Sequence, residues 1–346
     1  MYLWQVHENT LQEKGFNQMA TVDVTSARRA GSFLLLSLLG CGASLDDLRS
    51  NEKEPIMTTR LSYETLVSDG VVRANGSLPS GEALVSSPIT STLIFGSEDA
   101  VLIDPPMTIA QTQGVADWLA KSGKHLRYIY VTHGHGDHWF GASELVKRFP
   151  GAIVYATPGT IALMRKQATE GRQKVYDRDF PQLIGDTPVI AQPVPAGGFE
   201  LEGSALVPVE VGHTDTDDTT VLYVPSMGLV VAGDVVYNGV HQYLLEGGHG
   251  GIDAWLAALD KVDALHPRFV IAGHKNKALP DDPKAVEETR RYLLDVKRLL
   301  AAHPTPQAYY EQMLALYPDR LNRGPLWYSG VGLLAGQGTP APTVAK

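Results

Sequence analysis

The stretch VTHGHGDH (131–138) restricts the fold and chemistry of this chain more than any other part of it. It places three histidines and one aspartate within six positions, in a protein that has 11 histidines. The run RYIYVTH (127–133) leads into it and has the aromatic and β-branched residues typical of a strand. The sequence therefore predicts a strand that ends in a loop rich in metal-ligand side chains.

The side chains of this loop are suited to holding two metal ions. Imidazole and carboxylate groups are common zinc ligands, and residues two apart in an extended loop project to the same side. His133 and His135 can thus hold one ion, while Asp137 and His138, beyond the next glycine, can reach a second. Three imidazoles packed this closely would depress one another's pKa without a metal. We therefore favour metal ligation over a solvated histidine-rich loop.

Three further strand-like runs end at a metal-ligand type of side chain. ALVPVEVGHT (205–214) contains His213, GLVVAGD (228–234) ends at Asp234, and RFVIAGH (268–274) ends at His274. Either histidine alone would more often be a satisfied structural residue than a ligand. Four such strand ends together predict one metal centre at a shared sheet edge. A carboxylate between two cations reduces their repulsion, and Asp234 is the candidate for that position.

The remaining pattern alternates between hairpins and helices. Hairpins are predicted for 91–106 and 219–234, and helices for 108–123, 140–150, 158–175, 253–265 and 279–302. No repeat of solenoid length is present. The pattern fits an α/β fold with sheet packed on sheet and helices outside, an αβ/βα sandwich in one domain.

The motifs HGHGDH, GHT, AGD and AGH, in this order and spacing, resemble the metallo-β-lactamase superfamily over about residues 60–302. The resemblance implies a four-layer αβ/βα sandwich of two mixed sheets with outer helices. It also implies a ligand set: His133, His135 and His213 for the first ion, Asp137, His138 and His274 for the second, and Asp234 between them. Two glycines commonly follow the first motif in the family, whereas Trp139 and Phe140 stand here. Core packing is the preferred interpretation of these aromatics, ahead of a place in the pocket.

The same resemblance implies a hydrolase with two zinc ions, for which iron or manganese are alternatives. Two ions lower the pKa of a shared water, so that a bridging hydroxide can attack a substrate carbonyl. Asp137, besides ligating, can orient or receive a proton. The bridging Asp234 favours an ester, lactone or thioester substrate. β-Lactamase-type amide hydrolysis and an iron-dependent dioxygenase on the same fold are the alternatives.

Two further features of the sequence have more than one interpretation. Tyr237 lies three residues after Asp234, at an offset similar to that of a tyrosine in acyl-homoserine lactonases, where the hydroxyl can bond the substrate carbonyl. Simple packing of Tyr237 on the sheet is equally compatible with the sequence. The segment 165–190 could form a lid over the metals, although nothing in it identifies a ligand.

The composition restricts the class of partner and the kind of metal site that are possible. The formal net charge of -9 argues against nucleic acid as the main partner, because phosphate binding needs a basic face. A small molecule is the expected substrate. The single cysteine, Cys41, excludes an intramolecular disulfide and a multi-cysteine zinc site. No feature of the sequence predicts a particular oligomeric state.

The N-terminal region resembles an export signal. ARRAGSFLLLSLLGC (27–41) has two arginines, a short apolar run and an ending similar to a bacterial lipoprotein box. Lipidation of Cys41 would attach the protein to a membrane as an exported or periplasmic lipoprotein. A short buried helix with a free core cysteine, in a cytoplasmic protein, is the alternative. We expect a leader and tether over 1–55, a catalytic domain over 56–303, and a C-terminal helix and flexible tail over 304–346.

Overall fold

The computed structural model describes residues 60–248 and 251–335. The predicted signal at 27–41, with Cys41, and the last part of the predicted tail lie outside the described residues. Contacts group the described residues into one compact unit. Within these ranges, every helix is too short or too polar to cross a membrane.

The first sheet contains the strand that leads into the histidine cluster. Its strands, in spatial order, are β1 (Ser62–Ser68), β4 (Ile89–Phe95), β5 (Asp99–Ile103), β6 (His125–Tyr130), β7 (Ile153–Ala156) and β8 (Gln192–Pro193). β4 and β5 form the predicted hairpin, and β5 to β8 run parallel. The segments that follow β5 and β6 therefore leave the sheet at the same edge.

The second sheet supplies the other predicted ligands. Its order is β13 (Phe269–Lys275), β12 (Leu229–Asn238), β11 (Thr219–Val224), β10 (Ser204–Gly212) and β9 (Phe199–Leu201). β11 and β12 form the second predicted hairpin, and β12 runs parallel to β13. A small separate ribbon consists of β2 (Val72–Ser77) and β3 (Ala83–Val85).

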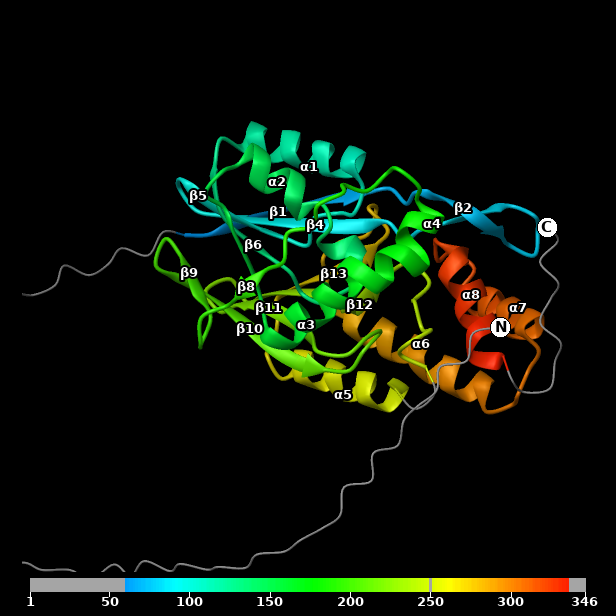
Figure 1. The fold of residues 1–346 in the computed structure, drawn as a ribbon. Helices are drawn as coiled ribbons and strands as arrows, with labels where there is room; N and C mark the ends of the chain where they lie inside the picture. Colours follow the sequence, from blue (N-terminus) through cyan, green and yellow to red (C-terminus); the bar gives the residue numbers. More distant parts are fainter. Residues whose placement is uncertain (1–59, 249–250, 336–346) are drawn as a thin grey trace, which may run out of the picture. The chain divides into compact units, whose positions relative to one another are not determined.

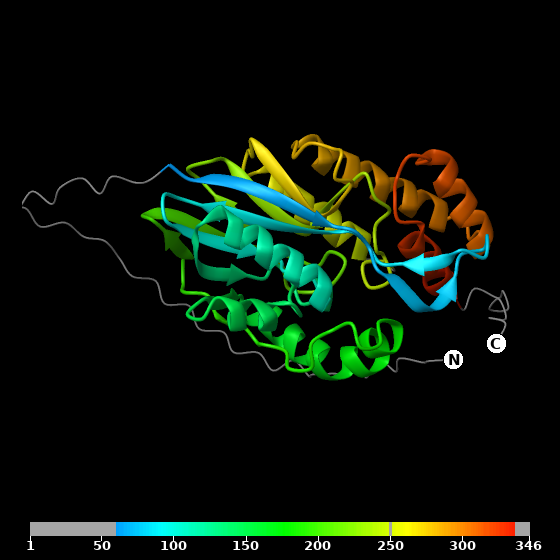
Figure 2. The same cartoon turned by 90° about the horizontal axis from the view of Figure 1, so that it is seen from above.

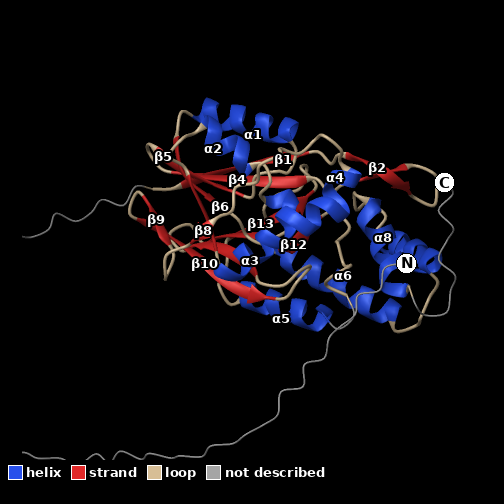
Figure 3. Cartoon of the chain, viewed as in Figure 1, coloured by secondary structure: helices blue, strands red, loops and turns tan. Residues whose placement is uncertain are grey.

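Helices cover the outer face of each sheet (Figures 1 and 3). On the first sheet lie α1 (Ile109–Ser122), α2 (Ala142–Arg148) and α3 (Pro158–Lys166), and on the second lie α5 (Gly251–Asp263) and α6 (Lys284–Leu300). Two short pieces, η1 (Gly136–His138) and α4 (Asp177–Asp179), and a π-helix, η2 (Gln167–Tyr176), lie in the connections. The view from above shows α7 (Pro306–Leu316) and α8 (Arg323–Leu334) beside the β2–β3 ribbon (Figure 2).

The layers follow from alternation along the strands. In β5, Leu102 packs in the cluster under α1 and α2, while its neighbour Val101 packs between the two sheets. In β12, Val230 packs towards α5 and α6, while Val231 faces the first sheet. Because side chains alternate across a strand, each sheet has two apolar faces, and three hydrophobic clusters fill the interfaces. The predicted four-layer αβ/βα sandwich is confirmed.

The main difference from the predicted elements is at the C-terminal end. The sequence predicts a flexible tail after the first helix of this region, yet the glycine-rich stretch after 318 contains α8. Leu326 of α8 and Tyr309 and Met313 of α7 are buried in the cluster that lines the second sheet. Burial of an apolar face offsets the low helix propensity of glycine. Residues 304–335 therefore pack as part of the same unit as the predicted catalytic domain.

Candidate metal centre

The loop after β6 meets β12 and β13 at one end of the two sheets. Three overlapping groups of ligand-type atoms lie within 4.8 Å of one another there: His133 with His135 and Asp215, His133 with His138 and Asp234, and Asp137 with His138 and His274. Six of the seven predicted ligands are thus brought together from three separate segments. Their coordination of metal stays a prediction.

Asp234 occupies the centre of the arrangement. Its Oδ1 lies 3.1 Å from His138 Nε2, and its Oδ2 lies 3.1 Å from His274 Nε2. The preceding residue, Gly233, has φ +50°, and a Cβ there would lie 2.4 Å from Thr132 Oγ1. Glycine is therefore needed for β12 to approach the segment before the histidine loop this closely.

His213 is the predicted ligand that the structure does not bring into these groups. Its Nδ1 lies 2.6 Å from Asp217 Oδ1, and its Nε2 faces the backbone at Gly251, where a Cβ would lie only 2.4 Å away. Asp215, two residues later, stands beside His135 instead, with Oδ2 at 2.8 Å from Nδ1. A bulge in β10 between Glu210 and Gly212 precedes this segment and changes the direction of its side chains.

The hydrogen bond on the outer nitrogen of His274 defines its tautomer. Nδ1 lies 2.7 Å from the carbonyl oxygen of Pro88. Because a carbonyl oxygen can only accept, Nδ1 carries a hydrogen and the neutral ring has its lone pair on Nε2. That lone pair faces Asp234 Oδ2 at 3.1 Å and Asp137 Oδ2 at 3.6 Å. A lone pair directed at two carboxylates requires a cation or a proton between them.

Asp104, which follows β5, orients two more rings in the same way. Its Oδ2 accepts from Thr132 Oγ1 at 2.7 Å and pairs with His138 Nδ1 at 3.0 Å. Having given its hydrogen to Asp104, the Thr132 hydroxyl accepts from His133 Nδ1 at 3.1 Å. The Nε2 lone pairs of His133 and His138 then point inward, as in metal sites whose histidine ligands are held by an outer carboxylate.

In His135 the two ring nitrogens are exchanged: Nε2 faces outward and Nδ1 faces the cluster. Its Nε2 lies 3.3 Å from Glu246 Oε1, and Glu246 Oε2 accepts from Thr216 Oγ1 at 2.8 Å. A hydrogen on Nε2 leaves the lone pair on Nδ1, which is the atom that faces Asp215. All four rings therefore have one nitrogen hydrogen-bonded outside the cluster and one directed into it.

The inward atoms fit a pair of cations. Four buried side-chain atoms at the centre have no hydrogen-bond partner among the described residues: His133 Nε2, His138 Nε2, Asp215 Oδ2 and Asp234 Oδ1. Leaving such an atom unsatisfied costs about 1–3 kcal/mol, and more for a charged group. Imidazole nitrogens and carboxylate oxygens are the donor set that divalent zinc, iron and manganese accept. The residues present thus suit a dinuclear centre.

Burial and neighbouring charges shift the pKa values of the groups that carry these inward atoms. Burial, with the charge of His138, lowers the pKa of His133 to about 4. Burial alone would lower the pKa of His138 and His274, but the Asp234 carboxylate outweighs it and raises both. Those two rings in turn hold the pKa of Asp234 well below its usual range, against the effect of burial. Protons and metal ions therefore compete for these atoms.

Tyr237 is a buried residue in contact with the central Asp234. Its hydroxyl donates to Asp234 Oδ2 at 2.5 Å, and its ring is fully buried. Burial and the neighbouring Asp234 raise its pKa, so the hydroxyl stays protonated as a donor. The Tyr237 hydroxyl thus contacts Asp234, and its predicted bond to a substrate carbonyl stays a prediction.

Three tyrosines from different elements gather beside the cluster. Tyr243 lies after β12 and packs edge-on against His135, with ring centroids 5.5 Å apart. Tyr328 of α8 lies 6.1 Å from Tyr243, and the Tyr176 hydroxyl at the end of η2 accepts from Gly136 N at 2.8 Å. The segment predicted as a lid therefore contacts the histidine loop through Tyr176. We refer to Tyr176, Tyr243 and Tyr328 as the tyrosine cluster.

Two other residues singled out from the sequence lie in the core. Trp139 and Phe140 are buried under α1 and α2, so the preferred core interpretation is confirmed.

The sequence analysis did not identify Asp104, Asp215 or Glu246 as residues of the site. For Asp104 the sequence held a usable signal, since it is an aspartate directly after a predicted apolar strand.

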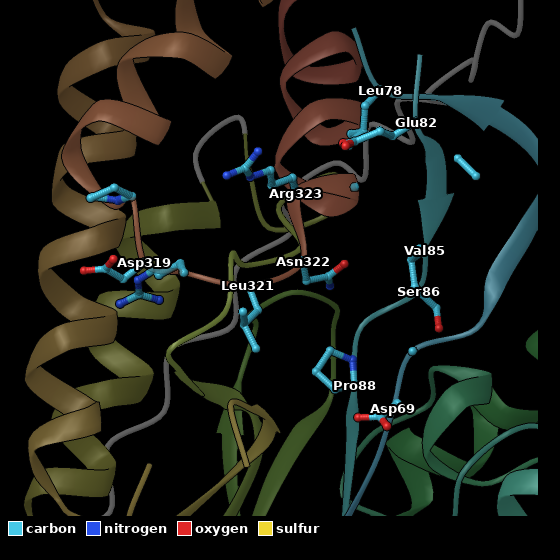
Figure 4. A pocket seen from close by; sticks show the side chains of 15 residues that line it. Asp69, Leu78, Glu82, Val85, Ser86, Pro88, Asp319, Leu321, Asn322 and Arg323 are labelled. Atoms are coloured by element: carbon cyan, nitrogen blue, oxygen red, sulfur yellow. The ribbon is translucent and has the colours of Figure 1, made fainter. Parts of the chain in front are cut away.

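A separate hollow contains none of the predicted site residues. It has a volume of about 570 Å³ and lies between the β3 end and the segment before α8 (Figure 4). Asp69, Glu82, Val85, Leu321 and Arg323 are among its lining residues. Its connection to the metal centre is Pro88, which lines the hollow and whose carbonyl contacts His274.

Comparisons with known proteins agree with this geometry. The family model described as the metallo-beta-lactamase superfamily matches residues 86–274. A metallo-beta-lactamase type 2 from Bacteroides fragilis is 25% identical over 70% of this chain and 88% of its own length. A hydroxyacylglutathione hydrolase from a Synechococcus strain is 28% identical over 63% of this chain and 70% of its own length.

A solved structure has the same fold. A metallo-beta-lactamase family protein from Thermus thermophilus superimposes with a TM-score of 0.52 at 20% identity, covering 79% of this chain and 94% of that one. The family match covers more than half of the sequence and contains the histidine loop, Asp234 and His274. The chain therefore belongs to the metallo-β-lactamase superfamily and is a metal-dependent hydrolase.

Proposed function

We propose that this protein is a dinuclear zinc hydrolase that cleaves a small carbonyl substrate, an ester, lactone or thioester. The observation that supports it most is the position of Asp234, whose two oxygens face ligand atoms of both groups, His138 and His274. A single carboxylate with one oxygen towards each group suits two cations close together. Iron or manganese in place of zinc would use the same atoms.

When bound, two such ions supply an activated water and polarise a carbonyl oxygen. The chain supplies the positioning. Tyr237 holds Asp234 through its hydroxyl, and Asp104 holds His138. Asp137 is the more exposed carboxylate, with 26% of its side chain accessible, and can accept or return a proton at Oδ2.

The relatives suggest two carbonyl classes. Hydroxyacylglutathione hydrolases, by their name, act on thioesters, and the Bacteroides fragilis enzyme is a β-lactamase. Asp234 at the centre favours the first class, because an aspartate at this position is expected for the lactonase, glyoxalase II and thioesterase branches. β-Lactam hydrolysis is the second candidate, and the Bacteroides fragilis relative supports it.

A hydrolysis screen tests the proposal. Purified protein, stripped by chelator and reloaded with zinc, would be assayed on a lactone, a thioester and a β-lactam panel. We expect activity on at least one ester-type substrate, loss of activity on chelation, and recovery with zinc. Asp234→Ala should lower kcat/KM by about 10²–10³-fold, the range for groups that act directly on the transition state.

The matched control is Asp186→Ala, because Asp186 is exposed and makes none of the side-chain contacts found at the centre. It should keep wild-type activity and metal content. Activity that resists both chelation and Asp234→Ala would refute the hydrolase centre. Bound iron in the protein as isolated, with oxygen uptake, would favour the dioxygenase alternative.

We also propose that the protein is exported as a lipoprotein through Cys41. The support is the sequence alone, RR followed by an apolar run and LLGC. Expression in a bacterium with labelled palmitate should give a labelled, membrane-associated protein, and Cys41→Ala should abolish the label. An unlabelled wild type in the soluble fraction would contradict it.

A further inference from the structure

We propose that Asp215, and not His213, completes the first metal group beside His133 and His135. The inference rests on the proposed metal centre and goes beyond it, because the family resemblance assigns this position to His213. It concerns which side chain of the segment GHTDTDD contacts the ion.

Burial and pairing distinguish the two residues. The Asp215 side chain is fully buried, and its Oδ1 accepts from Thr214 Oγ1 at 2.9 Å. Its Oδ2 lies 2.8 Å from His135 Nδ1 and 3.6 Å from His133 Nε2, and it has no hydrogen-bond partner within residues 60–248 and 251–335. A desolvated carboxylate oxygen that faces two imidazole lone pairs needs a positive charge at that point.

His213 has neither property. Its side chain is 27% exposed, and Nδ1 is paired with the exposed carboxylate of Asp217 at 2.6 Å. Its Nε2 is directed at the backbone of Gly251, at the start of α5. Both ring nitrogens are therefore turned away from the cluster, and the pair needs no ion to be satisfied.

Local backbone geometry accounts for the exchange. β10 ends at Gly212, which has φ +100° and follows a bulge. Thr214 N donates to Thr216 O at 2.9 Å, and the Thr214 and Thr219 hydroxyl oxygens lie 2.9 Å apart. These bonds close a compact turn that directs Asp215 inward.

The exchange changes the chemistry of the first group. A carboxylate replaces a neutral imidazole, so the group carries one more negative charge and one more oxygen donor. Oxygen donors suit harder ions such as Mn²⁺ better than imidazole does. The first group should accordingly discriminate less between zinc and manganese than a three-histidine group.

Metal titration of single variants tests the assignment without using activity. The metal-free protein would be titrated with Co²⁺ in competition with a chromophoric chelator. We expect Asp215→Ala to weaken one of the two binding steps by at least 100-fold. His213→Ala and Asp217→Ala should bind two equivalents with affinities within threefold of wild type.

Proton NMR of the Co²⁺-loaded protein gives a second measurement. Each coordinated imidazole contributes one exchangeable, strongly shifted ring N–H signal. Four signals are expected, from His133, His135, His138 and His274, and their number should be the same in His213→Ala. A fifth signal that disappears in His213→Ala, or loss of a cobalt equivalent in that variant, would overturn the assignment.

Two further measurements distinguish a wrong assignment of Asp215 from a misfolded variant and from a protein that has no metal centre. Asp215→Asn keeps the shape of the side chain, so it should keep the wild-type circular dichroism and still lose the affinity that Asp215→Ala loses. Full affinity in both variants would also refute the assignment. A wild-type protein that binds no cobalt at all would instead refute the metal centre on which it rests.

Discussion

At the scale of single residues, the centre depends on side chains outside the three groups of ligand-type atoms. The Asp104 carboxylate accepts from the Thr132 backbone N–H at 2.9 Å and from the Thr132 hydroxyl at 2.7 Å, and it also pairs with His138 Nδ1. One carboxylate thereby fixes the tautomers of two histidines, His133 and His138. Outer partners of this kind typically contribute 10–100-fold to metal affinity or activity.

Asp104→Asn should therefore weaken metal binding by about 10–100-fold without unfolding the protein. Asp104 has φ +54°, and asparagine tolerates this conformation better than alanine does. Competition with a chelator would measure the affinity, and circular dichroism the fold. Glu98→Gln, in the exposed turn before β5, is the control and should bind metal as wild type does. Unchanged affinity in Asp104→Asn would exclude the positioning role.

At the scale of elements, the site depends on segments outside the sandwich itself. The tyrosine cluster combines η2, the loop after β12, and α8. The Arg73 guanidinium of β2 lies over the Tyr328 ring at 5.0 Å, so the small ribbon supports α8 at this position. Burial, with Asp137 and Glu246 nearby, raises the pKa of Tyr176, and burial with Glu246 raises that of Tyr243. Both hydroxyls are neutral at physiological pH.

Tyr328→Ala should raise KM for the preferred substrate about tenfold and change kcat little. Removal of a partly exposed aromatic ring forfeits roughly 1–2 kcal/mol of apolar contact, and this ring lies beside the metal groups without joining them. Tyr328→Phe keeps the ring and should keep KM within about twofold. Steady-state kinetics on both variants would measure kcat and KM and so test this prediction. An equal fall in kcat with an unchanged KM would show that the ring does not contact substrate.

At the scale of the whole unit, one carboxylate connects the two sheets. Glu202, in the turn between β9 and β10, accepts four hydrogen bonds from the β4–β5 turn: Ser97 N at 2.9 Å, Ser97 Oγ at 2.8 Å, Glu98 N at 2.8 Å and Asp99 N at 2.8 Å. These donors, the Asp99 backbone N–H foremost, hold the pKa of Glu202 well below its usual value of 4.5.

Glu202→Gln should destabilise the protein by about 1 kcal/mol at pH 7, a value reduced for the solvent exposure of the carboxylate. Since the folded-state pKa is depressed, the stabilisation is complete above the unfolded value of 4.5 and is lost as pH falls below it. Urea unfolding at pH 7 and pH 3.5 would measure this, and the gap between wild type and variant should narrow at the lower pH. The exposed Glu200→Gln is the control. An equal gap at both pH values would contradict the charge-based explanation.

Much of the fold could be predicted because its signals are local. Alternating apolar residues in β5 and β12 identify strands with two buried faces, and that pattern requires layers on both sides. The side chains His133, His135, Asp137, His138, Asp234 and His274 could be named because each lies in or directly after an apolar strand. Strand ends meet at one edge in such a sandwich, so residue type and position brought these six together, although the same reasoning included His213, which lies outside the groups.

The sequence by itself thus determined the layered architecture and the kinds of atoms that gather at its edge. The tertiary structure alone decided which residue of GHTDTDD faces inward, how Asp104 contacts His138, and that Tyr328 packs beside Tyr243. The reason is physical: a bulge such as the one before Gly212 changes which side chains point to each face, and sequence spacing does not encode its effect. Contacts between distant segments depend on packing that no local pattern contains.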